Sequence, residues 1–98
     1  MSEFQVISVV KLKKLLEQRN LWSRMRSGKL LAVERNKAPA KISRGGTSYI
    51  ISYYDKSSKN FFTVHRIVTK EGNTIHEHVK DAYIDGIRYK ARPSKKSV

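Results

Sequence analysis

Three histidines, all those in the chain, are the side chains whose spacing could do chemistry. His76 and His78 alternate, so on a strand they would project from one face, and His65 lies in the preceding hydrophobic segment. These imidazoles could bind a metal, or two of them could act as general acid and base on a ribose 2′-hydroxyl and its phosphate, helped by Lys80 or Arg66. Because we expect no carboxylate on their face, we predict no metal site and no cofactor. Catalysis by the three histidines stays an alternative.

A run of short antiparallel strands would position the histidines. Alternating apolar residues predict strands at 48–54, 61–68 and 74–79, joined by the polar segment 55–60 and by a turn at Glu71-Gly72. A sheet that is buried on one side sends its apolar residues to that side, so the pattern predicts how the strands pair.

Pairing Tyr54 with Phe61, and closing the second hairpin at Glu71-Gly72, segregates the apolar residues best. The predicted pairs are Tyr53 with Phe62, Ile51 with Val64, Tyr49 with Arg66, Val68 with Ile75, Arg66 with Glu77, Val64 with Val79, and His65 with His78. The predicted inner face carries Tyr49, Ile51, Tyr53, Phe62, Val64, Val68, Ile75 and Val79. The outer face is expected to be wet and carries Ser48, Ile50, Ser52, Tyr54, Phe61, Thr63, His65, Ile67, Thr74, His76, His78 and Lys80. In this register the three histidines cluster, whereas a bulge beside Gly72 would slip the pairing by one residue and separate His65.

The N-terminal part of the chain has the pattern of amphipathic helices. Ser8 is a candidate N-cap for a helix at residues 9–19. Asn20 either ends that helix or lies inside a longer one, and Gly28 would end a second, short helix. Trp22 is expected in the core.

The remaining segments add strands at the edges of the sheet. Residues 29–35 favour a strand, residues 4–8 could add another, and Asp85-Gly86 indicates a tight hairpin. Residues 36–46 lose the apolar pattern and predict a basic loop. The pairs expected across the last hairpin are Tyr83 with Arg88 and Ala82 with Tyr89.

We therefore predict an α+β fold in which one or two N-terminal helices pack on an antiparallel meander of four to five strands; a small barrel is the alternative. Residues 1–90 would form a single basic domain and residues 91–98 a basic tail. The small core makes a homodimer plausible.

The net charge is the clearest functional signal. Lys and Arg number 21 against 8 Asp and Glu, which gives +13. Such an excess favours a polyanion, so we predict binding of DNA or RNA mainly through the phosphate backbone, with little sequence specificity. Tyr54 and Phe61 could stack on unpaired bases beside Lys80 and Lys59. The predicted contacting residues are Lys11, Lys14, Arg24, Arg26, Lys37, Lys41, Arg44, Lys80, Arg92, Lys95 and Lys96. An adaptor that binds an acidic protein partner would use the same charges.

Two absences narrow the class of protein. The chain has no cysteine, which excludes disulfides and zinc sites of the Cys-His type. No apolar run is long enough to span a membrane, and the N-terminus lacks a secretory pattern. We therefore expect a protein of the cytoplasm of its cell or host.

The segment Gly46-Thr-Ser-Tyr-Ile-Ile-Ser-Tyr-Tyr, followed by Thr63-Val-His-Arg-Ile, resembles the paired central strands of RelE/ParE-type toxins. That family consists of small basic helix-then-sheet proteins, and its members include ribosome-dependent ribonucleases. Ile50 stands where the family has an arginine, and the strands here continue to Tyr89. The resemblance supports, as an alternative function, a small metal-independent ribonuclease, for which the three histidines on the sheet are the candidate catalytic residues.

Overall fold

A computed structural model describes residues 4–92, which form an α+β fold with a six-stranded mixed sheet. The elements in chain order are β1 (Phe4–Ile7), α1 (Val9–Gln18), α2 (Leu21–Arg26), β2 (Leu31–Pro39), β3 (Thr47–Tyr54), β4 (Phe61–Val68), β5 (Thr74–Ile84) and β6 (Ile87–Ala91). The predicted class and the two N-terminal helices are confirmed, but the prediction of four to five antiparallel strands is wrong. The strand order is β1-β6-β5-β4-β3-β2, and β1 runs parallel to β6.

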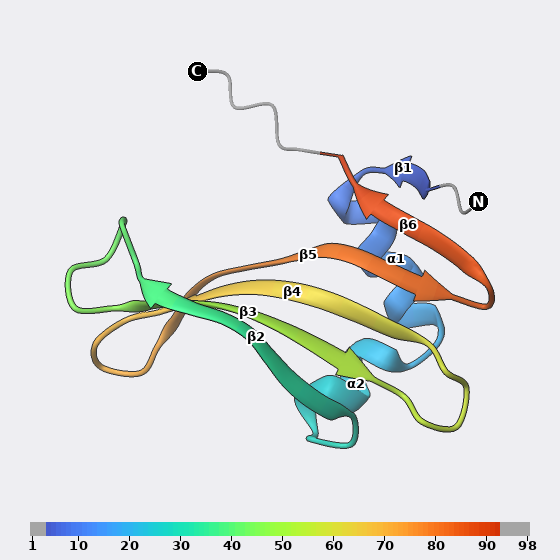
Figure 1. The fold of residues 1–98 in the computed structure, drawn as a ribbon, viewed down its shortest axis with the longest axis horizontal. Helices are drawn as coiled ribbons and strands as arrows, with labels where there is room; N and C mark the ends of the chain where they lie inside the picture. Colours follow the sequence, from blue (N-terminus) through green and yellow to red (C-terminus); the bar gives the residue numbers. More distant parts are fainter. Residues whose placement is uncertain (1–3, 93–98) are drawn as a thin grey trace.

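The position of the helices explains the parallel pair. β1 and β2 lie at opposite edges of the sheet, and the chain between them forms α1 and α2. Figure 1 shows α1 crossing behind β5 and β6. The two helices carry the chain from β1 at one edge of the sheet to β2 at the other edge. β1 can therefore pair with β6, the last strand of the chain, and the two strands run in the same direction.

No helix within residues 4–92 is long and apolar enough to cross a membrane.

Local signals set the helix boundaries. The Ser8 side chain accepts a hydrogen bond from the Lys11 backbone N–H at 3.1 Å and so caps α1. Asn20 adopts a left-handed conformation, with φ of 61°, and this separates α1 from α2. Gly28, with φ of 73°, follows the end of α2. Ser8 and Gly28 act as the sequence predicts, and Asn20, for which the sequence left two alternatives open, ends the first helix.

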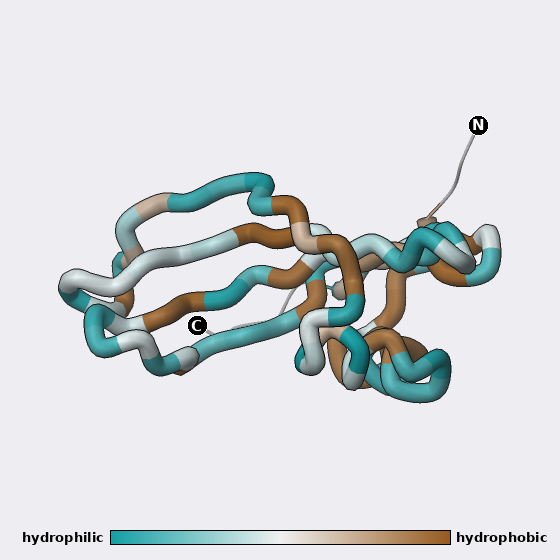
Figure 2. Tube along the Cα trace, turned by 90° about the horizontal axis from the view of Figure 1, so that it is seen from below, coloured by the Kyte–Doolittle hydropathy of each residue, from teal (hydrophilic) through white to brown (hydrophobic). Residues whose placement is uncertain are grey.

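The core lies between the helices and one face of the sheet. The helices contribute Leu12, Leu16, Leu21, Trp22 and Met25, and the sheet contributes Tyr53, Phe62, Val64, Val79, Ala82 and Ile84. Figure 2 shows that hydrophobic segments gather in the half of the molecule that contains the helices. The buried face is the predicted inner face at its centre, and Trp22 is buried as expected.

The strand register is confirmed at the histidines and wrong at the second turn. Val64 pairs with Ile51 and Val79, and His65 lies opposite His78. Val68, however, pairs with Thr74 instead of Ile75, which is 50% exposed.

The turn itself explains this difference. The Thr69 backbone N–H donates to the Asn73 carbonyl at 2.8 Å, which closes a three-residue loop and slips the pairing by one position. The ladder is irregular between Ile67 and Val68, because Ile75 has no Cα partner there. The extra residue restores the predicted register before the histidines.

β2 is longer than predicted and lies at the edge of the sheet. Its last residues, up to Pro39, pair with β3, so the predicted loop at 36–46 is reduced to residues 40–46. The ladder shifts between Glu34 and Asn36, which places a bulge at Arg35. Within residues 4–92, no strand pairs with the other edge of β2.

A partly buried ion pair between Arg24 and Asp55 joins α2 to the end of β3. The Asp55 carboxylate accepts hydrogen bonds from Arg24 Nη1, Ser57 Oγ and Ser58 Oγ, each at 2.8 Å, and from the Ser57 backbone N–H at 3.1 Å. These donors, Arg24 above all, hold the pKa of Asp55 well below its usual range despite burial. Asp55 therefore stays ionised in the folded protein at neutral pH.

We expect Asp55→Asn to lower the free energy of unfolding at pH 7 by about 2–3 kcal/mol, because Arg24 would lose its buried partner. Asp85→Asn is the matched control, since Asp85 and Arg19 form a pair that is about half exposed, and it should cost less than about 1 kcal/mol. The pKa of Asp55 is lowered on folding, so its stabilisation is complete above the ordinary carboxyl pKa and is lost as the pH falls. In urea titrations, the difference between wild type and Asp55→Asn should therefore shrink below about pH 4. Equal losses for both variants at pH 7 would contradict this account.

Candidate nucleic-acid interface

The outer face of the sheet is the side away from the helices. It carries the predicted outer residues of β3, β4 and β5, except Thr74, which pairs with Val68 of the inner face, together with residues of β1, β2 and β6. Not all of it is wet, because Ser52 and Ile67 are buried. The Ser52 hydroxyl is hydrogen-bonded to that of Thr63 at 2.9 Å, so its polar group is satisfied under the longer side chains around it.

A row of aromatic rings crosses three strands on this face. The ring centroid of Phe61 lies 5.2 Å from that of Tyr54 and 5.6 Å from that of Tyr83, and the planes of Phe61 and Tyr83 are 17° apart. Arg35 donates to the Tyr54 hydroxyl at 3.3 Å. Because the rings stack on one another, the row stabilises the pairing of the strands. Its contact with a ligand would be made by ring edges more than by ring faces.

A shallow hollow of about 470 Å³, which we call the central hollow, lies beside this row. Its basic side chains are Arg35, Lys80 and Arg88, and Asp81 is the one acid that lines it among the described residues. The guanidinium of Arg88 lies 5.0 Å from the ring centroid of Phe4 on the edge strand β1. The complete lining is Phe4, Arg35, Ile50, Ser52, Tyr54, Phe61, Thr63, Lys80, Asp81, Ala82 and Arg88.

A second hollow, of about 530 Å³, lies between β5, the end of β6 and the start of α1. We call it the histidine hollow. It is lined by Val9, His76, His78, Val79, Lys80, Lys90, Ala91 and Arg92. Lys80 lines both hollows because it is the extra residue of a β5 bulge: Val79 pairs with Val64, and Asp81 pairs with Thr63.

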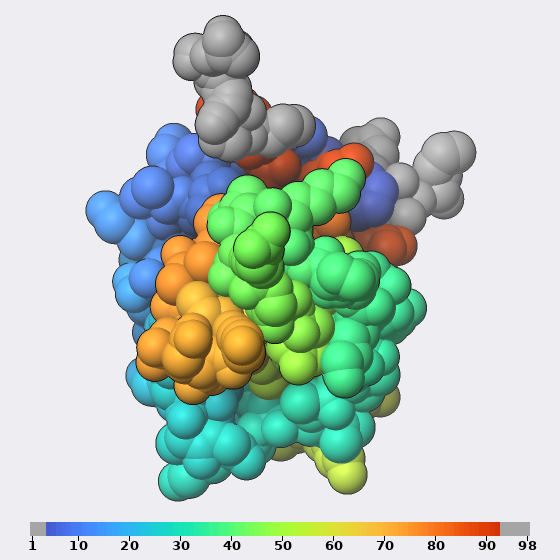
Figure 3. Space-filling view, turned by 90° about the vertical axis from the view of Figure 1, so that its left-hand side faces the viewer, coloured from blue at the N-terminus to red at the C-terminus, as the bar shows by residue number. Residues whose placement is uncertain are grey.

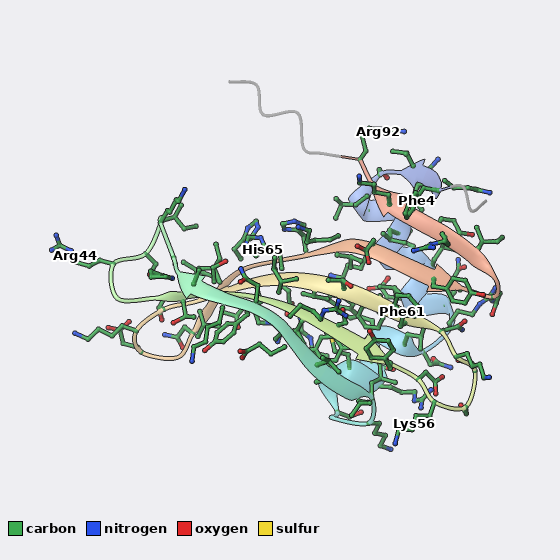
Figure 4. The ribbon with its side chains drawn as sticks, viewed as in Figure 1. Phe4, Arg44, Lys56, Phe61, His65 and Arg92 are labelled. Atoms are coloured by element: carbon green, nitrogen blue, oxygen red, sulfur yellow. The ribbon has the colours of Figure 1, made fainter. Side chains whose placement is uncertain are left out.

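The three histidines meet at this side of the sheet, as the register predicts. His76 Nε2 lies 2.8 Å from His78 Nδ1, and His65 Nε2 lies 2.8 Å from the Ser48 hydroxyl. The ring centroids are 4.8–5.5 Å apart, and each pair of rings meets edge to face. Figure 4 places His65 midway along the sheet, between Phe61 and the loop that carries Arg44.

The surroundings disfavour charge on two of these rings. Burial lowers the pKa of His65, and the charges of His76 and Lys80 lower it further. The pKa of His78 is lowered by burial and then by the charges of His76, His65 and Lys80. Both rings are therefore mainly neutral near pH 7.

Several predicted contacting residues lie elsewhere. Arg24 pairs with buried Asp55, and Arg26 pairs with Glu77, which Arg66 also contacts at 2.6 Å. Arg24 and Arg26 therefore attach α2 to the residue that follows β3 and to β5. Lys11 and Lys14 are exposed on α1, and neither side chain lines either hollow.

The other predicted residues divide between the ends of the sheet. Lys37 lies 5.9 Å from the Tyr49 ring centroid on the inner side of β2 and β3, whereas Lys80 and Arg92 line the histidine hollow. Lys41 and Arg44 belong to loop 40–46. Lys95 and Lys96 lie outside the described residues, and so does most of the predicted tail; residue Ala91 is part of β6.

Loop 40–46 adjoins the turn at 69–73. Figure 3 shows these two segments side by side at one end of the molecule. A Cβ added to Gly45 would lie 3.2 Å from the Lys70 side chain, and one added to Gly46 would lie 2.7 Å from the Val68 carbonyl oxygen. Glycine is therefore required at position 46, and it brings the basic groups of the two loops together.

Sequence reasoning missed Arg35, Arg88 and Lys90 as members of this interface. Arg88 and Lys90 alternate with Ile87 and Tyr89 along β6, so the pattern of period two could have placed them on the outer face. Arg35 sits at the bulge of β2, which alternation cannot predict.

Comparison with known proteins gives no information about the function. No protein-family model, no curated protein and no solved structure matches this chain.

Proposed function

We propose that the protein binds nucleic acid through the outer face of its sheet, mainly by contacts to phosphates. One observation supports this most: five basic side chains surround the two hollows, and Asp81 is the one acid that lines either of them among the described residues. The five are Arg35, Lys80, Arg88, Lys90 and Arg92.

The distribution of ion pairs supports the same surface. Asp55, Glu77 and Asp85 are paired with arginines of the helical segment, so their negative charge is neutralised away from the outer face. Among the described residues, basic side chains then outnumber acidic ones around the two hollows and in the loops at 40–46 and 69–73. A polyanion that lies along this face would gain affinity by releasing its counterions, without reading base sequence.

A pair of charge-reversal variants tests the proposal. Lys80→Glu/Lys90→Glu should weaken binding by at least about tenfold and lower the salt slope on duplex DNA by about 2, because two phosphate contacts are lost. Lys11→Glu/Lys14→Glu makes the same change in net charge on the helix side and should have a much smaller effect. Fluorescence anisotropy with duplex DNA, single-stranded DNA and single-stranded RNA measures both quantities and ranks the three ligands.

Two outcomes would contradict the proposal. Equal losses for both double variants would mean that binding follows net charge and has no defined face. Stronger competition by an acidic polypeptide than by nucleic acid would favour an adaptor for an acidic protein partner.

A ribonuclease is the second candidate, and the contact of His65, His76 and His78 beside Lys80 is the observation that favours it. General acid-base cleavage uses the 2′-hydroxyl as the nucleophile, so such an enzyme would cut RNA and leave DNA intact. Cleavage by the purified protein that is lost in His65→Ala and in His78→Ala would replace binding by catalysis as the function.

A further inference from the structure

The three histidines offer nitrogen ligands from a rigid support. His65 on β4 lies directly opposite His78 on β5, and His76 precedes His78 by two positions on the same face. One ring nitrogen of each residue lies within 4.8 Å of those of the other two. The backbone positions are fixed by the ladder between β4 and β5, so bringing the ligands together requires side-chain rotation alone.

The spacing fits a small metal ion. Zn²⁺ binds imidazole nitrogen at about 2.0–2.1 Å, and tetrahedral ligands are then about 3.3 Å apart. The shortest separation here, 2.8 Å between His76 Nε2 and His78 Nδ1, is below that value, and the longest is 4.8 Å. Rotations that move ring nitrogens by about 1 Å would equalise the three distances. A shared ion would then replace the hydrogen bond between His76 and His78.

Groups next to the three histidines would orient one ligand and influence the fourth ligand position of such a site. The Ser48 hydroxyl is in hydrogen-bond contact with the His65 ring and orients it, as oxygen partners of metal-binding histidines do. Three imidazoles leave one tetrahedral position for water or another oxygen ligand. Because imidazoles do not neutralise a divalent ion, and Lys80 lines the same hollow, that position would favour hydroxide or an anionic oxygen.

We propose that His65, His76 and His78 form a three-imidazole site for a first-row divalent ion of the zinc class. The ligand set is borderline-soft nitrogen, which suits Zn²⁺ and Co²⁺ and does not suit Mg²⁺. The chain has no cysteine and no fourth histidine, so it offers no second nitrogen or sulfur site of this kind. The proposal reverses the prediction made from the sequence, and it does not depend on nucleic-acid binding.

Metal binding to the full chain, without a histidine tag, tests the proposal directly. Equilibrium dialysis should give one Zn²⁺ per chain, and Co²⁺ should produce the visible absorption of a tetrahedral complex. His76→Ala and His78→Ala should each weaken Zn²⁺ affinity by at least about tenfold. Loss of a residue that only hydrogen-bonds to a metal ligand already weakens metal affinity by that factor, and here the ligand itself is lost. Lys80→Ala is the control on the same strand, and it should bind Zn²⁺ at least as well as the wild type because a nearby positive charge is removed.

The outcomes separate a built site from adventitious binding. Thermal unfolding should shift upward with Zn²⁺ in the wild type and in Lys80→Ala, and should be unchanged by Mg²⁺. No tetrahedral Co²⁺ spectrum from the wild type, or Zn²⁺ affinity that survives both histidine substitutions, would overturn the proposal.

Discussion

Val64→Asp is expected to abolish folding, whereas Ile75→Asp should leave the protein folded. Val64 is fully buried between β3 and β5, so the substitution would place an unpaired carboxylate in the core. A cost above about 4 kcal/mol is a large part of the ~5–15 kcal/mol that stabilises a domain of this size. Circular dichroism and urea titration measure the effect.

Ile75 is an informative control because alternation in the sequence assigns it to the same inner face as Val64. The structure places it at a bulge with half of its surface exposed. Ile75→Asp should therefore change the free energy of unfolding by no more than about 0.5 kcal/mol. Unfolding by Ile75→Asp, as by Val64→Asp, would instead support the register predicted from the sequence, in which Ile75 pairs with Val68 on the buried face, and would contradict the bulge at Ile75.

Salt should weaken binding to duplex DNA steeply. If each of the five basic side chains around the hollows contacts one phosphate, log K should fall with log salt at a slope of about −4.5. A rise from 50 to 200 mM salt then reduces affinity by about 500-fold. Anisotropy titrations at four salt concentrations give the slope, and a slope near zero would remove phosphate binding as the function.

The central fold could be predicted because alternation is a strong signal in half-buried strands. The pairing of β3 with β4 follows from the apolar residues that alternate through Tyr53 and Phe62. The helix boundaries could also be predicted, because the Ser8 side chain caps the start of α1 and the positive φ of Gly28 follows the end of α2, and both effects depend on local sequence alone.

Bulges limited the rest of the prediction. Each bulge inserts one residue and reverses which residues face the core, so alternation read across it fails. At Lys80 the pattern breaks, which is why the predicted strand stops at Val79 although β5 continues to Ile84. The parallel pairing of β1 with β6 depends on the path of the helices across the sheet, which no local pattern contains.

The candidate site was predictable where it depended on register and missed where it depended on topology. The clustering of His65, His76 and His78 follows from strand pairing alone. The partners of Arg24 and Arg26 could not be foreseen, because Asp55 and Glu77 are distant in sequence and meet them only after α2 docks.

The uncovered edge of β2 has a consequence for how concentrated solutions of this protein behave. Across residues 4–92 no strand covers this edge of the nine-residue β2, and such an edge is a template on which other chains can polymerise. Here the bulge at Arg35 interrupts the flat stretch, and the charged residues Glu34, Arg35 and Lys37 of this stretch are exposed. The same short segment therefore contributes a basic group to the central hollow and disfavours the addition of further strands at this edge.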